Sequence, residues 1–427
     1  MNKRASQIPW MRSLLFIGIL LALLQVLNFT PHQTAHLKNG NYWPYFYREL
    51  EADTLDIVFM GNSHSKTTII PEIIDRLLGT RSVHVNTSGE SIYQTQYEFR
   101  EVLRHQSPRL IVLEANPIYA GLSPDELKPW NFSFFYAMPF SWQKLAYSHD
   151  FFNENDLLKF YLPFTSYHAD WKNPDQAITR IKESIAQLKN RREAGWHEVL
   201  PYQGYENYLR SLPLNAQRDP QTNLESTCSV PDMAARLTVT EQMLQRAQRA
   251  EQLMVIMETA QFVQQFPQCR DAATALAEHY GVEYIQLMED EELPPLWFGD
   301  EVHMTQFGAV IASVEMAQRI AELLEIPINR ELLEVYQTYF FSGYTLEQNG
   351  DSVTVTLIPH DPEAIQEMQF QWDVSRNNEI FLEVEEAGIH ALRFTLPEPS
   401  GNYFIHIVMY NPAIHYYLRG GISLDLE

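Results

Sequence analysis

Residues 55–65 read LDIVFMGNSHS, and this stretch decides the fold. The run from 55 to 60 is short and mostly apolar, which is typical of a strand buried in a parallel sheet. Gly61 ends the run, and Ser63 follows in the turn that leads toward Pro71, a residue suited to the first turn of a helix. The pattern therefore predicts a strand, a polar turn that holds Ser63, and a helix.

Strand and helix signals continue to alternate along the chain. Further strands are expected at 82–85, 110–113, 253–257 and 282–287, and helices at 71–78, 93–105, 238–250, 270–280 and 305–324. Strands separated by helices predict an α/β fold, with a parallel sheet covered by helices on both faces, over residues 53–330.

Two other regions have a different character. Residues 117–230 are rich in aromatic residues and proline, and we expect them to form an insertion that serves as a lid or substrate wall. From about residue 335 apolar residues alternate with polar ones, in runs near 353–357, 380–384, 392–396 and 403–410. Because turn-forming residues such as Asn349-Gly350 separate these runs, residues 335–427 are expected to form a C-terminal β-sandwich.

The N-terminal segment predicts a membrane anchor. Residues 13–29 carry no charge, whereas Lys3, Arg4 and Arg12 precede them. About 20 apolar residues span a bilayer, and the positive-inside rule keeps the N-terminus in the cytoplasm. Residues 1–52 are therefore expected to be a tail, one transmembrane helix and a connector, with everything later outside the cytoplasm. A cleaved signal peptide is the alternative, although residues 25–29 offer no small-residue cleavage site.

The composition narrows the range of partners and cofactors. The net charge is −23 over 427 residues, which argues against a nucleic-acid partner. No phosphate loop, dinucleotide fingerprint or metal-ligand cluster occurs, so no cofactor and no metal are predicted. The two cysteines, Cys228 and Cys269, either form a disulfide or remain two separate thiols.

Polar residues follow the ends of three predicted strands and precede the last predicted helix. They are Ser63, Gly89 and Asn116, and then Asp300 with His303. Because ligands bind beyond the carboxyl ends of parallel strands, we expect these residues to converge there. A serine becomes a nucleophile when a base takes its proton and a third group orients that base. This predicts Ser63 as nucleophile, His303 as base and Asp300 as the orienting group.

Acyl transfer also needs hydrogen-bond donors for the developing oxyanion. The backbone amides of Ser63 and Gly89 and the side-chain amide of Asn116 are the candidate donors.

The order of these blocks resembles the SGNH (GDSL-like) hydrolase superfamily, whose four blocks carry Ser, Gly, Asn and Asp-any-any-His. The match runs over roughly residues 53–325. The chain departs from that pattern at Asn62, where Asp is usual, and at Glu114-Ala115-Asn116-Pro117 in the third block. The resemblance implies a three-layer α/β fold and serine ester chemistry.

Within the superfamily the layout is most similar to anchored bacterial proteins of alginate O-acetylation and of teichoic-acid D-alanylation. That similarity implies a single-pass protein of the bacterial cytoplasmic membrane, beside a membrane-bound O-acyltransferase. It also implies an acylated cell-surface glycan or related acyl ester as substrate. His64, His168 and Trp171 are the candidate substrate-binding residues.

Three hypotheses follow. The first is an extracytoplasmic serine esterase or O-acyltransferase, two activities that share an acyl-enzyme and that the sequence does not separate. The second is a catalytically inactive scaffold or carbohydrate-binding module of an envelope assembly. The third is a surface protein in which the triad is a coincidence.

Overall fold

The computed structural model describes part of the chain and divides it into two compact units. The described residues are 10–20, 22–24, 46, 52–120, 138, 141–161, 178–179, 182, 211–212, 232–262, 267–289, 293–338, 341–376, 379–387, 390–398, 400–412 and 416–426. One unit comprises Met1–Leu50 with Pro124–Pro201, and the other comprises Glu51–Ser123 with Tyr202–Glu427. The candidate site lies wholly within the second unit.

A parallel sheet of five strands forms the centre of the α/β region. Its strands are β1 (Ile57–Gly61), β2 (Ser82–Asn86), β3 (Leu110–Glu114), β4 (Leu253–Glu258) and β5 (Tyr284–Gln286). The strand order is β2-β1-β3-β4-β5, and every neighbouring pair is parallel. The predicted parallel α/β sheet is therefore confirmed, with β5 shorter than expected.

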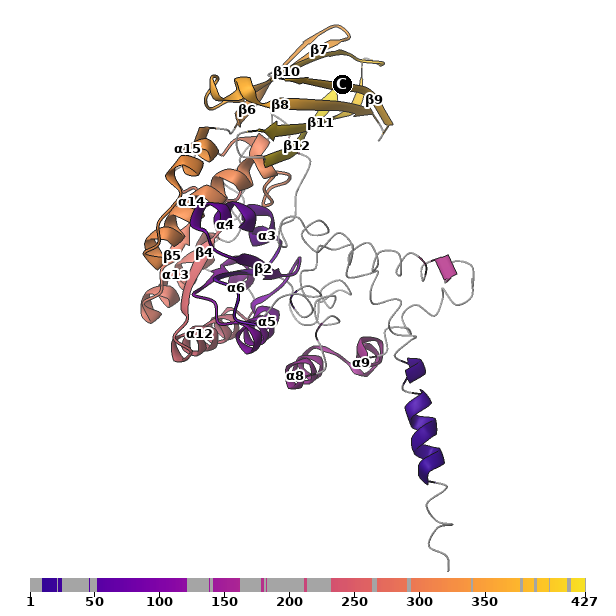
Figure 1. The fold of residues 1–427 in the computed structure, drawn as a ribbon, viewed down its shortest axis with the longest axis vertical. Helices are drawn as coiled ribbons and strands as arrows, with labels where there is room; N and C mark the ends of the chain where they lie inside the picture. The colour runs from indigo at the N-terminus through magenta and orange to yellow at the C-terminus, as the bar shows by residue number, and fades with distance from the viewer. Residues whose placement is uncertain are drawn as a thin grey trace, which may run out of the picture. The chain divides into compact units, whose positions relative to one another are not determined.

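Helices cover both faces of this sheet (Figure 1). α4 (Pro71–Leu78), α14 (Gln306–Leu324) and α15 (Arg330–Thr338) pack together on one face. α5 (Ile92–His105), α12 (Met233–Arg249) and α13 (Pro267–Tyr280) belong to the other. The alternation of side chains along β1 explains the two layers, because Ile57 and Phe59 join the core beneath α4 and α14. Val58 and Met60, also fully buried, point to the opposite face.

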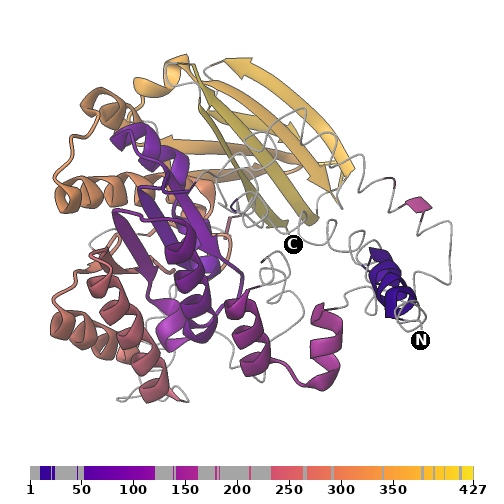
Figure 2. The ribbon, with the colours of Figure 1, turned by 60° about the horizontal axis from the view of Figure 1, so that its bottom comes forward.

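The C-terminal strands form two antiparallel sheets. One contains β6 (Phe341–Asn349), β7 (Ser352–Pro359) and β10 (Ala391–Thr395). The other contains β8 (Gln369–Arg376), β9 (Glu379–Ala387), β11 (Gly401–Asn411) and β12 (Tyr416–Leu426). Apolar residues of both sheets, among them Val355, Trp372 and Ile405, share one buried cluster that continues into the α/β region. Figures 1 and 2 both show these sheets beside α14 and α15.

The first unit is described only in pieces. Within the predicted insertion, α8 (Trp142–Phe151) and α9 (Glu154–Tyr161) are helical, and the rings of Tyr147, Phe152 and Phe160 pack against one another. His168 and Trp171 lie outside the described residues.

The predicted membrane anchor is not supported by the part of the chain that the structure describes. In that part, no helix has both the length and the apolar character needed to cross a bilayer. Residues 10–20 and 22–24 are helical.

Candidate active site

The turn after β1 is shaped by two residues that precede Ser63. Gly61 has a φ of +152°, and a Cβ at this position would lie 2.5 Å from the Cβ of Glu114, so only glycine fits. Asn62 caps α3 (Ser63–Thr68), because its Oδ1 accepts a hydrogen bond of 3.0 Å from the backbone amide of His64. Ser63 is therefore the first residue of a helix at the carboxyl end of a buried strand.

The structure brings Ser63, His303 and Asp300 together, although Ser63 and His303 are 240 residues apart. The Oγ of Ser63 lies 2.7 Å from Nε2 of His303, and Nδ1 of His303 lies 2.7 Å from Oδ2 of Asp300. Because a carboxylate only accepts, Nδ1 carries the ring proton and Nε2 is the atom that accepts from the serine hydroxyl. This is the tautomer that a general base requires.

Asp300 is held in its charged form by its hydrogen bonds. Burial acts to raise the pKa of this carboxyl, but the hydrogen bonds from the His303 ring and the Val302 amide outweigh burial and lower it. The charge of His303 and the His303 amide act in the same direction. Both backbone amides donate to Oδ1 at 2.9 Å, which fixes the carboxylate before it meets the imidazole.

The loop that carries Asp300 and His303 is closed at its base. Phe298 and Met304 form an antiparallel bridge, and the amide of Gly299 donates to the carbonyl oxygen of His303 at 2.8 Å. Gly308, in the first turn of α14, allows the helix to approach the loop closely: a Cβ there would lie 2.8 Å from Cβ of Trp297.

Two of the three candidate oxyanion donors, Gly89 and Asn116, lie after the ends of β2 and β3. Gly89 has a φ of +69° in the turn after β2. The carboxyl of Glu90 holds this turn, because its Oε2 accepts from the amide of Thr87 at 2.7 Å and from the Thr87 hydroxyl at 3.1 Å. Asn116, at the start of α6 (Asn116–Tyr119), accepts from Nδ2 of Asn62 at 2.7 Å. Its own Nδ2 is buried and has no hydrogen-bond partner among the described residues.

The order of the strands explains why these turns meet. In an open sheet of order 2-1-3-4-5, the connections after the first and third strands leave toward opposite faces, and ligands bind at that point. Ser63 follows β1 and Asn116 follows β3, and β1 pairs directly with β3. The candidate site therefore lies at the switch point of the sheet.

His64 is a buried second imidazole beside His303. The two ring centroids are 5.4 Å apart in an edge-to-face arrangement. Burial and then the charge of His303 lower the pKa of His64 to about 3, against a weaker raising effect of Asp300. His64 is therefore neutral, and Nε2 of Gln261, 3.4 Å from its Nδ1, is the donor to it.

Gln261 and a group of buried acids beneath the site were not predicted from the sequence. Gln261 follows β4, so the strand-end rule that selects Asn116 would have selected it too. Burial raises the pKa of Glu114 well above its usual value and raises that of Glu90 to about 8. Burial and the neighbouring Glu90 also raise the pKa of Glu98. A single sequence does not show such pairs, because their partners are set by packing.

Two further features bear on the predictions. Among the described residues, no group of histidine, cysteine, aspartate and glutamate side chains is placed to hold a metal ion. Cys269 is buried in α13 and is disulfide-bonded. Cys228, the other cysteine, lies outside the described residues.

Comparisons with known proteins do not assign a family. No family model and no curated protein matches the chain. Among solved structures, a protein of Bacteroides fragilis assigned as an acylhydrolase is 12% identical, with a TM-score of 0.32, over 65% of this chain and 92% of that one. An acetyl xylan esterase from Butyrivibrio proteoclasticus is 10% identical, with a TM-score of 0.30, over 65% of this chain and 66% of that one.

A third similar structure is the extracellular region of rat CD45, domains d3-d4. It is 14% identical with a TM-score of 0.17, and it covers 20% of this chain and 47% of that one. The chain thus spans about half the length of this structure. TM-scores this low do not identify a family.

Proposed function

We propose that the chain is a serine acyl-ester enzyme in which Ser63 is the nucleophile, His303 the base and Asp300 the orienting group. The observation that supports this proposal is the pair of 2.7 Å contacts that join Ser63 Oγ to His303 Nε2 and His303 Nδ1 to Asp300 Oδ2. A serine that merely capped a helix would not need an imidazole at its hydroxyl or a carboxylate behind that imidazole.

The mechanism starts with His303 taking the Ser63 proton while Oγ bonds to the carbonyl carbon of the ester. The negative charge that develops on the carbonyl oxygen is met by backbone amides of Ser63 and Gly89 and by Nδ2 of Asn116. The partnerless state of Nδ2 supports this role, because an unpaired buried donor costs about 1–3 kcal/mol that a ligand oxygen would recover.

The intermediate then collapses, and the leaving alcohol departs with the proton held by His303. The acyl group remains on Ser63. Water resolves the acyl-enzyme in a hydrolase, whereas a sugar hydroxyl resolves it in an O-acyltransferase, and His303 activates either nucleophile in the same way.

The proposed substrate is an acylated cell-surface glycan, or a related acyl ester, outside the cytoplasm. The likeness of the sequence blocks to anchored envelope proteins supports this proposal, as does the disulfide at Cys269, because disulfides persist in oxidising compartments. A membrane-bound O-acyltransferase as partner rests on the sequence resemblance alone.

Replacement of the nucleophile tests the proposal. The Ser63→Ala variant is expected to lose covalent labelling by a fluorophosphonate and to lose at least about 10³-fold in turnover of an acetyl ester. Ser342→Ala, which changes an exposed serine of β6, serves as the matched control and is expected to label and turn over as the unmodified chain does.

Labelling or turnover that persists in Ser63→Ala would contradict the assignment. If neither protein has ester chemistry, yet both retain affinity for an acylated glycan, the inactive-scaffold alternative is favoured. Addition of a deacylated glycan to the active enzyme separates the two activities, because a transferase yields acylated glycan and a hydrolase yields only free acid.

A further inference from the structure

The side chain of Asn62 makes hydrogen bonds to the three turns that carry Ser63, Gly89 and Asn116. Its Oδ1 accepts from the backbone amide of His64 at 3.0 Å, in its own turn after β1. Its Nδ2 donates to Oδ1 of Asn116 at 2.7 Å, after β3, and to the carbonyl oxygen of Glu90 at 3.5 Å, after β2. Asn62 is only 3% exposed, so these protein groups satisfy its amide.

The backbone amide of His64 fixes the direction in which the amide of Asn62 points. A backbone N–H only donates, so the atom of Asn62 that faces it must be the oxygen. Nδ2 of Asn62 therefore faces Asn116, and the atom of Asn116 that meets this donor must again be the oxygen. Nδ2 of Asn116 is consequently turned away from Asn62, and it is buried without a hydrogen-bond partner among the described residues.

The backbone of Asn116 is held separately from its side chain. Oε1 of Glu114 accepts from the backbone amide of Asn116 at 2.8 Å. At the other end of α6, Nη1 of Arg236 donates to the carbonyl oxygen of Ala120 at 2.6 Å. With both ends of the short helix fixed, the direction of the Asn116 amide is what remains to be set. Asn62 is the side-chain partner that the described residues offer this amide.

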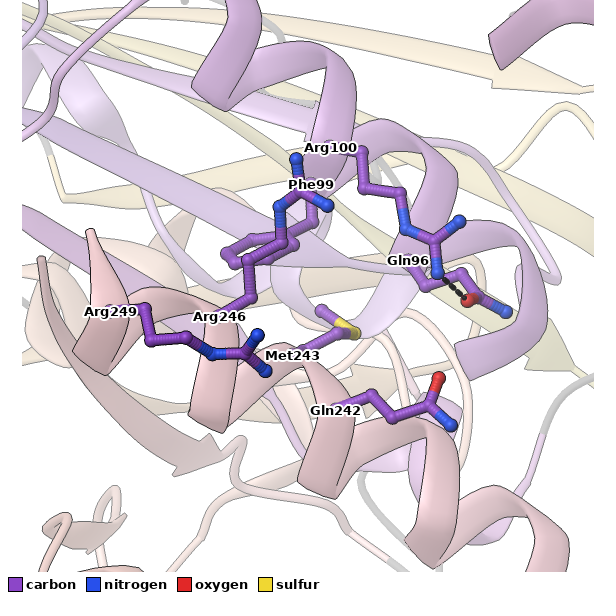
Figure 3. Close-up of a pocket in the computed structure, with 7 residues that line it drawn as sticks. All are labelled: Gln96, Phe99, Arg100, Gln242, Met243, Arg246 and Arg249. Carbon is purple, nitrogen blue, oxygen red and sulfur yellow. Dashed lines mark hydrogen bonds between the residues drawn. The ribbon is translucent and has the colours of Figure 1, made fainter.

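Helix packing also fixes the turns that Asn62 joins. α12, which carries Arg236, packs against both α5 and α6. α5 begins directly after the turn that contains Glu90. Figure 3 shows the contact between α5 and α12, where the side chains of Phe99 and Met243 are buried. The turns after β2 and β3 are therefore placed by helices, and the bond to Asn62 is free to set the orientation of a single amide.

We propose that Asn62 is a positioning residue that turns Nδ2 of Asn116 toward the oxyanion of the reacting ester. This inference rests on the proposed function, in which Nδ2 of Asn116 is one of the donors to the developing charge. A donor aimed in advance stabilises the transition state without reorganisation. An aspartate in place of Asn62 would still accept from the amide of His64, but it could not donate to Asn116. The amide of Asn116 would then reverse and present its oxygen to the oxyanion.

The Asn62→Asp variant tests the proposal, because it keeps the helix cap and changes a donor into an acceptor. At pH 8, about four units above the usual pKa of aspartate, kcat for an acetyl ester is expected to fall about 10²-fold or more. KM is expected to change little, since the lost interaction belongs to the transition state. Asn329→Asp is the matched control: Asn329 is exposed and caps α15 by accepting from the amide of Leu332 at 3.1 Å, and kcat is expected to be unchanged.

A double-variant cycle separates this positioning role from a general effect of the new charge. Asn116→Ala is expected to lower kcat about as much as Asn62→Asp does, and the combined variant is expected to lose no more than Asn116→Ala alone. A loss from Asn62→Asp that is equally large with and without the Asn116 side chain overturns the proposal. An unchanged kcat in Asn62→Asp also overturns it.

The orientation of the two amides is tested without ester chemistry by proton–nitrogen NMR spectra of the full chain labelled at asparagine. The side-chain signal of Asn62, identified by its absence in Asn62→Ser, is expected to move upfield in Asn116→Ala, because one Nδ2 proton loses its acceptor. A signal that stays in place overturns the proposal. An unmodified chain that turns over no ester would count against the proposed function instead, while the spectra still decide whether Asn62 bonds to the oxygen of Asn116.

Discussion

At the scale of single residues, Asp300 accepts three hydrogen bonds, two from backbone amides and one from the His303 ring. The backbone amides fix its position before catalysis, so that the carboxylate has only one orientation toward Nδ1. This arrangement favours the ring tautomer in which Nε2 is free to accept the Ser63 proton.

The Asp300→Asn variant is expected to reduce ester turnover by up to ~10⁴-fold, because an amide donor at this position favours the wrong imidazole tautomer. Asp373→Asn is the matched control, since Asp373 also faces a histidine, His406 at 3.3 Å, but on β8 and β11. Turnover measured at saturating substrate is expected to be unchanged in the control. Equal activity of the two variants would contradict the role of Asp300.

The buried carboxyl of Glu90 predicts how the free energy of unfolding depends on pH. Burial raises its pKa from 4.5 to about 8, so the folded chain keeps a proton that the unfolded chain loses. The stabilisation that protonated Glu90 gives the folded chain is fully present below pH 4.5. It is lost as pH rises toward 8, and the free energy of unfolding then falls by up to about 1.4 kcal/mol per pH unit. Glu90→Gln is expected to flatten this fall in the free energy of unfolding, measured by urea denaturation from pH 5 to 8.

Glu322→Gln, on the exposed side of α14, is the control for that series and is expected to keep the slope of the unmodified chain. Burial lowers the pKa of His64 to about 3 and that of His84 to about 4, so both histidines oppose the Glu90 effect below pH 6.5. Their contribution is the same in all three proteins. A slope that survives in Glu90→Gln would assign the titration to Glu98 or Glu114, because burial raises the pKa of both carboxyls.

The sequence predicted that Ser63, Asp300 and His303 lie together, but it did not predict the buried hydrogen bonds around them. Ser63, Asn116, Asp300 and His303 were predictable because each follows a strand end or precedes a helix, which are positions visible in the chain. The hydrogen bond between Asn62 and Asn116, and the burial of Glu90 and Glu114, depend on the packing of side chains across strands. No periodicity in the sequence records those contacts.

At the scale of elements, the loop between η6 (Pro295–Trp297) and α14 sets the position of His303. The loop is tied at Phe298 and Met304, and the amide of Thr305 donates to the carbonyl oxygen of Trp297 at 2.9 Å. Because α14 starts directly after this loop, any shift of the first helical turn moves the imidazole.

Gly308→Ala is expected to produce such a shift. Its Cβ would lie 2.8 Å from both Cβ and the carbonyl oxygen of Trp297, so the helix or the loop must move. We expect a loss of about 1–3 kcal/mol in the free energy of unfolding and a fall in kcat/KM for an acetyl ester. Gly343→Ala, whose Cβ would meet nothing closer than 3.8 Å, is expected to leave kcat/KM unchanged. A normal kcat/KM in Gly308→Ala would show that the loop does not position His303.

Element prediction succeeded where the local pattern was simple. The five strands of the parallel sheet are apolar runs bounded by turn residues, and they were found within a few residues. β12 was missed because Gly420 and Gly421 interrupt it, and glycine is disfavoured inside strands. β8 was missed although Phe370, Trp372 and Val374 alternate in it, because the expected strands were placed only on either side of it.

At the scale of the whole molecule, the antiparallel sheets contact the region that carries the triad. Gln306 at the start of α14 donates to the hydroxyl of Tyr416 at 2.9 Å and accepts from the amide of Arg419 at 2.8 Å. The indole of Trp297 donates to the carbonyl oxygen of Phe341 at 2.7 Å. The ring of Phe307 lies against the backbone of Gly420, where a Cβ would come within 2.0 Å of Cε2.

Gly420→Ala is therefore expected to lower the free energy of unfolding and the ester turnover together. A second change, Phe307→Leu, is expected to recover part of the loss, so that the double variant is more stable than the sum of the single effects predicts. Urea denaturation of the four proteins of this cycle measures the coupling. Strict additivity would show that Gly420 and Phe307 do not constrain each other.

The composition of the chain did not predict this contact. The hydrophobic periodicity changes from 3.6 to 2 residues near residue 335, and this change correctly separated the helical from the antiparallel region. It also suggested that the antiparallel region is an independent domain. The glycine that admits Phe307 sits in a strand that the pattern did not reveal. Packing between residues far apart in the chain depends on the complementary shapes of two surfaces, and the hydropathy of the sequence does not predict it.

The contact between Gly420 and Phe307 also limits how such a protein can diversify. β12 packs against Phe307, four residues after His303, so it cannot be exchanged for an unrelated module as a tethered accessory domain can. Recombination at the junction near residue 339 would have to bring along a matching glycine and a matching aromatic ring. Engineered chimaeras that ignore this pairing should express as two folded halves and fail as a catalyst.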